Sequence, residues 1–293
     1  MRVGTFAAAK VNLYLHVIGR RADGYHLLDS LVAFPDIGDR VIAELAPGFS
    51  LEIIGPEAAA LVDDGRENLV LRAARLLAER IGTRAGARLR LEKNLPVAGG
   101  IGGGSSDAAA ALRALAALWD APISREDLCE LGLKLGADVP ACLYGGPVWV
   151  GGIGERIEPA ALPPAGILLA NPRRPLPTAA VFAARSGEFG KVGRFERMPE
   201  DAAGLAQALS SRHNDLTSAS LGFVAEIGAV LGRLARLPGA LLARMSGSGP
   251  TCFALFRDRA EADEARAVLS AFEHEWWCAA GALVACAEPD FPT

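Results

Sequence analysis

The sequence has few cysteines, and none of them has a partner at a metal-binding spacing. The five cysteines are an odd number and form neither a CxxC pair nor a cysteine and histidine spacing suited to zinc. This pattern argues against a zinc site and predicts buried, reduced thiols. The residues concerned are Cys129, Cys142, Cys252, Cys278 and Cys286.

A basic block and a long apolar run are also missing. The formal net charge of -4 is spread over both halves, which argues against a nucleic-acid surface that neutralises phosphates. No apolar run approaches the ~18 residues of a membrane span, and the faint signal-like stretch from Val3 to Ala9 runs into a strand pattern. We therefore expect a cytoplasmic protein without a membrane or nucleic-acid partner, present as a monomer or weak homodimer.

The length of 293 residues favours two domains, and 51% hydrophobic residues are ample for two cores. Prolines cluster from Glu158 to Arg174, which suggests a crossing between domains. We place the boundary near residue 160, with domains over 1–160 and 161–293. The mixture of strand and helix patterns predicts an α+β architecture.

Hydrophobic periodicity predicts strands and helices in both halves. In the first half, strands are expected over 11–18, 41–45, 51–54 and 87–93, and helices over 70–81, from Ser105 or Ser106 to Trp119, and over 124–135. The 11–18 strand alternates apolar and polar residues, so we expect one of its faces in the core. In the second half, helices are expected over 201–209, 222–237 and 261–272, and strands over 167–170, 240–245, 251–256 and 282–285.

The most informative segment connects a predicted strand to a predicted helix. It contains five glycines in the six positions Gly99 to Gly104. Such a loop can turn successive backbone N–H groups inward, and the following helix N-terminus favours an anion. We therefore predict that it binds a polyphosphate. Its residues are Pro96, Val97, Ala98, Gly99, Gly100, Ile101, Gly102, Gly103, Gly104, Ser105, Ser106 and Asp107.

The chain lacks both GxxxxGK[ST] and a GxGxxG after a strand, so neither a P-loop nor a dinucleotide-binding fold is supported. The alternative is a glycine-rich turn that only permits tight strand–helix packing. A second small-residue loop over Met245–Thr251 is by itself more typical of a turn. Paired with the first loop, it suggests the opposite wall of a cleft between domains.

Two ionisable residues are candidates for chemistry, although each has a plain structural explanation. Lys10 precedes the first clear strand and is typical of a surface lysine. Asp138 follows a predicted helix stop and is typical of a helix N-cap. Sequence spacing alone does not bring them together.

Five segments occur in the order seen in the GHMP kinase superfamily, which the chain resembles over nearly its whole length. They are AKVN at Ala9–Asn12, ADGYH at Ala22–His26, the glycine-rich loop, GADVP at Gly136–Pro140 and SGSGP at Ser246–Pro250. DGYH together with KVN resembles the branch that phosphorylates the 2-hydroxyl of 4-diphosphocytidyl-2-C-methyl-D-erythritol in the non-mevalonate isoprenoid pathway. Other branches accept homoserine, mevalonate or a sugar.

This resemblance implies a two-domain GHMP kinase fold with the active site in the cleft. The N-terminal domain would be a β-rich α/β domain of the ribosomal-protein type, and the C-terminal domain a ferredoxin-like α+β domain. ATP and Mg²⁺ would be the cofactors, and a small molecule the partner. Asp138 would accept the proton of the substrate hydroxyl, while Lys10 would orient it and stabilise developing charge.

The resemblance also implies binding roles for several residues. Some of these residues have a plain structural explanation as well. Tyr25 and Phe182 would flank the cytosine ring and His26 would hydrogen-bond its edge, although both aromatics also suit a core. The other residues so implied are Asn12 and Thr178 on the substrate side and Asn68 and Lys93 on the nucleotide side. Asn68 also suits a helix N-cap, and Ser105 or Ser106 would either bind the metal or cap the helix.

Two arginines fit no pattern of the superfamily. Arg173 and Arg174 follow a predicted strand in a proline-rich segment. There are two alternatives for this pair: the arginines bind a diphosphate group, or they form a solvated basic turn. A nucleotide-binding module without catalysis is a further alternative for the whole chain, and the presence of both Lys10 and Asp138 argues against it.

Overall fold

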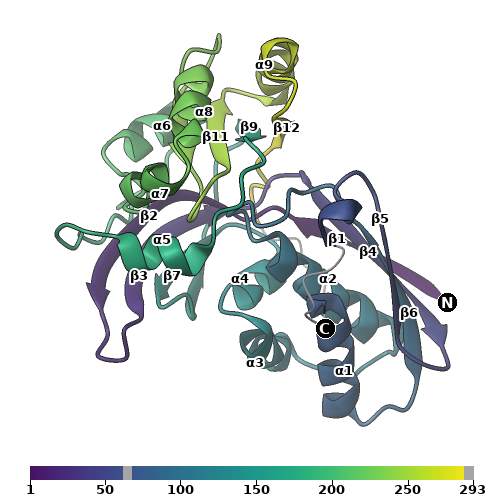
Figure 1. The fold of residues 1–293 in the computed structure, drawn as a ribbon. Coiled ribbons are helices and arrows are strands. Elements are labelled where there is room, and N and C mark those ends of the chain that lie inside the picture. The colour runs from purple at the N-terminus through teal and green to yellow at the C-terminus, as the bar shows by residue number, and fades with distance from the viewer. Residues whose placement is uncertain (62–67, 287–293) are drawn as a thin grey trace.

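The computed structural model describes residues 1–61 and 68–286 of the chain. Figure 1 shows the blue and teal elements of the first half at one end of the molecule and the green and yellow C-terminal elements at the other. A purple N-terminal hairpin extends beneath the C-terminal elements, so the two halves interlock along the hairpin. The mixture of helices and sheets confirms the expected α+β class.

The first sheet has the strand order β1–β4–β6–β5, antiparallel except for the parallel pair β5 and β6. Its strands are β1 (Arg2–Ala8), β4 (Gly38–Ala46), β5 (Ser50–Ile54) and β6 (Gly86–Glu92). The helical elements of this half are η1 (Ala58–Leu61), α1 (Leu69–Ile81), α2 (Gly103–Leu118), α3 (Arg125–Leu135) and α4 (Val139–Tyr144). Leu89 and Leu91 of β6 pack into the core that α1 and α2 form on one face.

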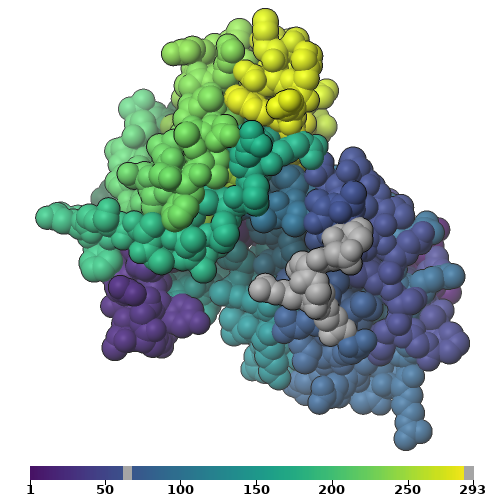
Figure 2. Space-filling view, in the orientation of Figure 1, coloured from purple at the N-terminus to yellow at the C-terminus, as the bar shows by residue number. Residues whose placement is uncertain are grey.

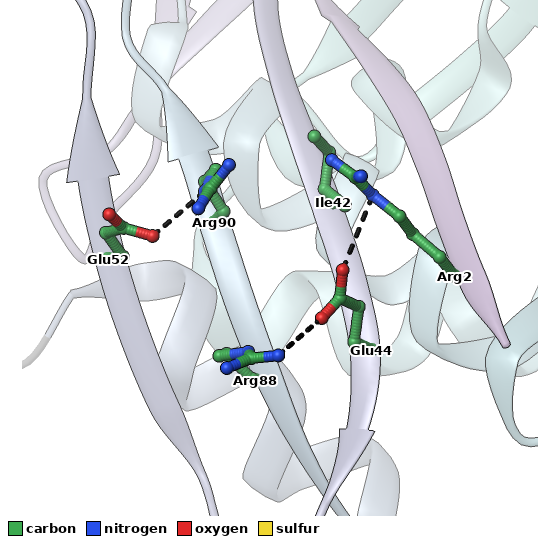
Figure 3. Close-up of a pocket in the computed structure, with 6 residues that line it drawn as sticks. All are labelled: Arg2, Ile42, Glu44, Glu52, Arg88 and Arg90. Atoms are coloured by element: carbon green, nitrogen blue, oxygen red, sulfur yellow. Dashed lines mark hydrogen bonds and ion pairs between the residues drawn. The ribbon is translucent and has the colours of Figure 1, made fainter.

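The other face of this sheet carries a ladder of paired charges, which Figure 3 shows around a shallow pocket. Glu44 binds Arg88 at 2.7 Å and Arg2 at 3.5 Å, and Glu52 binds Arg90 at 2.9 Å. These side chains are substantially exposed, so the pairs contribute little to stability. All five charged side chains are already paired, and we assign this pocket no role in chemistry.

The second sheet has the order β2–β3–β7–β8 and is antiparallel throughout. Its strands are β2 (Val11–Arg20), β3 (His26–Ala33), β7 (Val148–Gly152) and β8 (Arg156–Pro159). The expectation that only one face of β2 is buried is wrong, because Asn12, Tyr14 and His16 are buried as well. C-terminal segments cover this polar face and pair along the edge of β2: His16 Nδ1 lies 2.8 Å from Lys191 O, and Asp215 accepts a hydrogen bond from Val17 N at 2.6 Å.

The third sheet, β10–β11–β9–β12, is antiparallel and belongs to the C-terminal half. Its strands are β9 (Gly166–Asn171), β10 (Leu242–Met245), β11 (Cys252–Phe256) and β12 (Trp277–Ala282). The helices of this half are α5 (Thr178–Ala184), α6 (Ala202–Ser210), α7 (Thr217–Phe223), α8 (Glu226–Leu234) and α9 (Arg259–Phe272). The division of the chain at residue 160 stays a prediction.

Local signals located several element ends correctly. Gly82 ends α1 in the left-handed conformation (φ 69°), and Ser124 caps α3 by accepting a hydrogen bond from Asp127 N at 3.0 Å. The single helix expected over 222–237 is wrong, because extended backbone at Val224 separates α7 from α8. The last strand lies earlier than expected, and β1, β3, β7, β8, α4 and α5 were not predicted.

The thiols are only partly as expected. All five cysteines are free, and Cys142 and Cys252 are buried. Cys286, however, is exposed, which corrects the prediction for that residue. Among the described residues, no helix is long and apolar enough to cross a membrane.

One buried arginine joins β10 to the rest of the molecule. Arg244 donates hydrogen bonds to Leu13 O at 2.6 Å, Leu209 O at 2.9 Å and Arg212 O at 2.6 Å. Burial lowers the pKa of this guanidinium to about 10, which leaves it charged at neutral pH. The charge therefore satisfies three carbonyl groups from β2, α6 and the loop after α6.

We predict that Arg244→Met lowers the free energy of unfolding by about 3 kcal/mol, because three buried carbonyl groups lose their donor. Urea denaturation followed by circular dichroism measures this. Arg257→Met removes an exposed arginine of the same half and serves as the control, with unchanged stability expected. Equal effects of the two substitutions would contradict the assigned role of Arg244.

Candidate active site

The glycine-rich loop leaves β6 and enters α2 with an unusual backbone. Gly100 (φ 71°) and Gly102 (φ 65°) are left-handed, a conformation that favours glycine. Helix α2 begins at Gly103, two residues before the expected start, because Ser106 N already donates to Gly102 O at 2.9 Å. The N–H groups of residues 103–105 precede this bond and point out of the helix end, where an anion is favoured.

The second small-residue loop lies directly against the first. Thr251 N donates to Gly99 O at 3.1 Å, and a Cβ atom on Gly100 would lie 2.3 Å from Gly249 O. The structural alternative is therefore correct in part: glycine at position 100 is required for this close packing. It does not account for Gly104, where an added Cβ would meet only Leu69 at an ordinary 3.6 Å.

The structure brings Lys10 and Asp138 together across 128 positions of sequence. Lys10 Nζ donates to Asp138 Oδ1 at 2.8 Å. The Lys10 side chain is only 10% exposed, and a Cβ atom on Gly102 would lie 3.0 Å from Lys10 Cβ. Asp138 occupies the N-cap position of α4 but makes no side-chain capping bond. Lys10 is therefore not a surface lysine, and the Asp138 carboxylate faces Lys10 instead of capping its helix.

A second lysine lies beneath the loop between two carboxylates. Lys93 Nζ donates to Asp39 at 2.5 Å and to Asp107 at 2.7 Å, and all three side chains are buried. Asp39 also accepts hydrogen bonds from Asn94 N at 2.5 Å and Leu95 N at 2.8 Å. One ammonium group thus joins the residues just before the loop to the first turns of α2.

The cluster has one carboxylate more than it has cations. Burial, together with the charge of Asp39, raises the pKa of Asp107 to about 7, although Lys93 opposes the shift. The Lys93 pKa is raised despite burial, because both carboxylates attract its charge. Lys93 therefore supports the loop from below through its ion pairs with Asp39 and Asp107. Its predicted contact with a nucleotide stays a prediction.

Asn68 has the partner expected of its structural alternative, whereas Ser106 does not cap α2, because Gly102 holds the N-cap position without a side-chain capping bond. Asn68 caps α1, since its Oδ1 accepts a hydrogen bond from Val70 N at 2.9 Å. Ser106 is buried and donates to Cys142 Sγ at 3.3 Å. Ser105 instead points toward Gly136, two residues before Asp138, because a Cβ atom there would lie 4.0 Å from Ser105 Oγ.

The expected substrate residues line β2, β3 and α5 near the second loop. His26 and Phe182 have ring centroids 5.4 Å apart, and Tyr25 is 60% exposed. Burial, followed by the charges of Arg20 and Arg185, lowers the His26 pKa, so its ring is neutral at pH 7. The ring that contacts Phe182 is therefore His26, and Tyr25 projects outward beside it.

Two polar groups tie this side of the site to the second loop. Thr178 Oγ1 lies 2.9 Å from Ser248 Oγ. Asn12 N donates to Ser246 Oγ at 3.1 Å, and Asn12 Nδ2 donates to Ser30 at 2.8 Å. Asn12 Oδ1 is buried without a hydrogen-bond partner beside the second loop, where a Cβ atom on Gly247 would lie 3.5 Å from it. Figure 2 shows a recess between the green C-terminal half and the teal part of the first half.

Sequence reasoning missed several residues that organise the site. Asp39, Asn171 and Asn214 support the two loops, and Asn214 donates to Met245 O and Gly247 O, both at 2.8 Å. Neither Asp39 nor Asn171 stands in a recognisable motif or at a fixed spacing. Their roles depend on contacts between segments that are far apart in the sequence.

We predict that Asp107→Asn changes the pH dependence of stability. Because the folded-state pKa of Asp107 lies above its unfolded value near 3.9, the native protein binds the extra proton between about pH 4 and 7. The unfolding free energy of the unsubstituted protein should therefore fall relative to the variant as pH rises through this window, by on the order of 4 kcal/mol. Urea titrations at several pH values measure it, and parallel profiles would contradict a proton on this carboxyl group.

Comparisons with known proteins agree with the site. The models named GHMP kinases N terminal domain and GHMP kinases C terminal match residues 68–146 and 195–274. The chain is 51% identical over 279 residues to the 4-diphosphocytidyl-2-C-methyl-D-erythritol kinase of Paramagnetospirillum magneticum, covering 95% of this chain and 97% of that protein. It is 52% identical to the same kinase of Rhodospirillum rubrum, covering 95% and 91%.

Solved structures confirm the two-domain fold. A crystal structure of 4-(cytidine 5'-diphospho)-2C-methyl-D-erythritol kinase has a TM-score of 0.78 and 38% identity, covering 96% of this chain and 98% of that one. Homoserine kinase from Cytophaga hutchinsonii has a TM-score of 0.73 at 18% identity, covering 98% and 96%, and shows the fold alone. The chain therefore belongs to the GHMP kinase family, in the branch of the 4-diphosphocytidyl-2-C-methyl-D-erythritol kinases.

Proposed function

We propose that the chain transfers the γ-phosphoryl group of ATP to the 2-hydroxyl of 4-diphosphocytidyl-2-C-methyl-D-erythritol, a step of the non-mevalonate isoprenoid pathway. The observation that carries this proposal is the ion pair of Lys10 and Asp138 beside the glycine loop. Relatives at about half identity over nearly the whole chain carry the name of this kinase. In this proposal ATP is the phosphoryl donor, and the reaction takes place in the cytoplasm.

The glycine loop supplies the donor site. The left-handed Gly100 and Gly102 let the loop pack against Gly249 and Lys10, and the first N–H groups of α2 favour the charge of a phosphate. Asn68 starts α1 and, in this proposal, borders the adenine. The buried cluster of Lys93, Asp39 and Asp107 keeps the loop in place during the reaction.

The Asp138 carboxylate acts as the general base. It takes the proton of the acceptor hydroxyl as the oxygen attacks the γ-phosphorus, and the bond from that phosphorus to the bridging oxygen breaks as ADP leaves. Lys10 holds Asp138 Oδ1 at 2.8 Å and fixes the direction of the second oxygen. The Lys10 ammonium also stabilises the negative charge that develops on the transferred group.

The side chains at the site fit a Mg²⁺ ion whose ligands are mainly phosphate oxygens and water. Among the described residues, no group of three histidine, cysteine, aspartate or glutamate side chains surrounds a common point. Mg²⁺ in kinases often keeps several waters and takes few protein ligands. Ser105 is the hydroxyl that would hold it, since Ser106 is engaged with Cys142. When bound, the ion would neutralise phosphate charge.

Acceptor recognition rests on the rings near the second loop. His26 packs on Phe182, and its neutral imidazole can donate to and accept from the edge of a cytosine. The exposed ring of Tyr25 is suited to stack on the face of such a base. A site for homoserine, mevalonate or a sugar has no base to stack, so these rings favour the cytidyl acceptor.

We predict that Asp138→Ala lowers kcat by about 10² or more with little change in the affinity for ATP, because only the proton acceptor is lost. A coupled assay of ADP release with the cytidyl acceptor measures the rate. Asp138→Asn keeps the shape and should be nearly as slow. Turnover close to normal in either variant would exclude Asp138 as the base.

We predict that Tyr25→Ala raises KM for the cytidyl acceptor about tenfold while KM for ATP changes little, because stacking on a base contributes roughly 1–3 kcal/mol. Phe272→Ala removes a ring that is 70% exposed on α9 and is the control. The same assay with homoserine and mevalonate tests the acceptor class. An unchanged KM for the cytidyl acceptor in Tyr25→Ala would point to a different acceptor.

A further inference from the structure

Arg173 has an unusual position between the two halves of the molecule. It follows β9 and has φ 56°, a left-handed conformation that few arginines adopt. Asn171 Oδ1 holds its backbone by accepting a hydrogen bond from Arg173 N at 2.7 Å. A strained backbone that neighbouring contacts maintain is often tied to function.

The Arg173 guanidinium reaches across to the first half and binds Glu57. Nη1 donates to Glu57 Oε2 at 2.9 Å and Nη2 donates to Oε1 at 2.8 Å, so the pair is bidentate. Glu57 is 4% exposed, and its N–H donates to Lys93 O at 3.1 Å. Glu57 is thus attached to the residue whose ammonium supports the glycine loop.

A chain of hydrogen bonds continues from Arg173 to the loop. Asn171 Nδ2 donates to Thr251 Oγ1 at 2.8 Å, and Thr251 N donates to Gly99 O at 3.1 Å. A Cβ atom on Gly99 would lie 3.1 Å from Thr251 Oγ1 and 3.2 Å from Asn171 Nδ2. The same short segment, Asn171 to Arg173, therefore contacts both Gly99 in the loop and Glu57 beside the strand that leads to it.

We propose that Arg173 is a positioning residue for the donor nucleotide. By binding Glu57, Arg173 holds the C-terminal half and the second loop against the glycine loop. It acts through Glu57 and Asn171 and does not touch the reacting atoms. Arg173 is thus paired with a buried carboxylate and is not part of a merely solvated basic turn, whereas a contact with a diphosphate stays a prediction. The proposal rests on the proposed function for its effect on ATP.

The neighbouring arginine provides a matched control. Arg174 Nε donates to Glu226 Oε1 at 2.8 Å, but both side chains are about half exposed and belong to the C-terminal half. Arg174→Met therefore removes the same charge from the next position without breaking a link between the halves. Its effect on the glycine loop should be negligible.

The experiment compares Arg173→Met, Arg174→Met, Glu57→Gln and the double variant Glu57→Gln with Arg173→Met in the full chain. We expect Arg173→Met to weaken ADP binding, measured by calorimetry, and to raise KM for ATP about three- to tenfold. kcat and KM for the acceptor should change less. Amide hydrogen exchange in peptides over residues 96–107 should become faster in this variant and stay unchanged in Arg174→Met.

The double variant separates positioning from simple destabilisation. Arg173→Met leaves a buried carboxylate unpaired, whereas the double variant carries no charge there. If Arg173 acts through Glu57, the double variant loses no more nucleotide affinity than Glu57→Gln alone, even where urea denaturation shows that its stability is recovered.

Two results would overturn the proposal. One is unchanged ADP affinity and unchanged exchange over residues 96–107 in Arg173→Met, and the other is an equal effect of Arg174→Met. Failure of the unsubstituted protein to bind ADP at all would count against the proposed function instead. The exchange comparison needs no nucleotide, so it would still decide whether Arg173 positions the loop.

Discussion

The arrangement of the site depends on the close approach of two backbones, that of the glycine loop and that of the second loop. Gly100 and Gly249 leave no space for a Cβ atom between them, and Thr251 N binds Gly99 O. The other side of the glycine loop is fixed by Lys10, whose N–H donates to Ile101 O at 2.8 Å. Because the loop is held from both sides, the start of α2 and the Lys10 side chain have defined positions.

The two lysines of the site differ in what surrounds them, and this difference separates support from chemistry. Lys93 is buried between two carboxylates. Its ammonium group is already paired inside the protein and is not exposed to a substrate. Lys10 shares one carboxylate, and that carboxylate is 47% exposed. A base must reach the hydroxyl whose proton it takes. Only the Lys10 and Asp138 pair meets that condition.

The sequence allowed prediction of those parts that depend on neighbouring residues. The ends of α1 and α3 follow from Gly82 and Ser124, whose capping bonds are local. The α+β class and the glycine-rich connection between β6 and α2 follow from periodicity and from five glycines in six positions. The burial of both faces of β2 could not be predicted, because Lys191 contacts His16 on the polar face across 175 positions of sequence.

The candidate site shows the same limit. Lys10 and Asp138 were recognisable only through resemblance, since nothing in their local patterns distinguishes them from a surface lysine and a helix cap. Arg173 and Glu57 lie 116 positions apart, and their pairing required the folded structure. The start of α2 was misplaced because Gly102, with no side chain to cap the helix, occupies the N-cap position where a serine was expected.

The distribution of the site over both halves bears on how the two substrates meet. The glycine loop belongs to the first half, whereas α5 belongs to the second, where Thr178 lies beside Ser248 and Phe182 packs on His26 of β3. In the proposed function an acceptor that binds beside these two rings contacts both halves, and its distance from the donor depends on how the halves are joined. The joining contacts at Gly99, Gly100 and Glu57 all lie beside the donor loop. Since phosphoryl transfer depends mainly on positioning, these contacts align donor and acceptor as directly as the residues that touch the substrates.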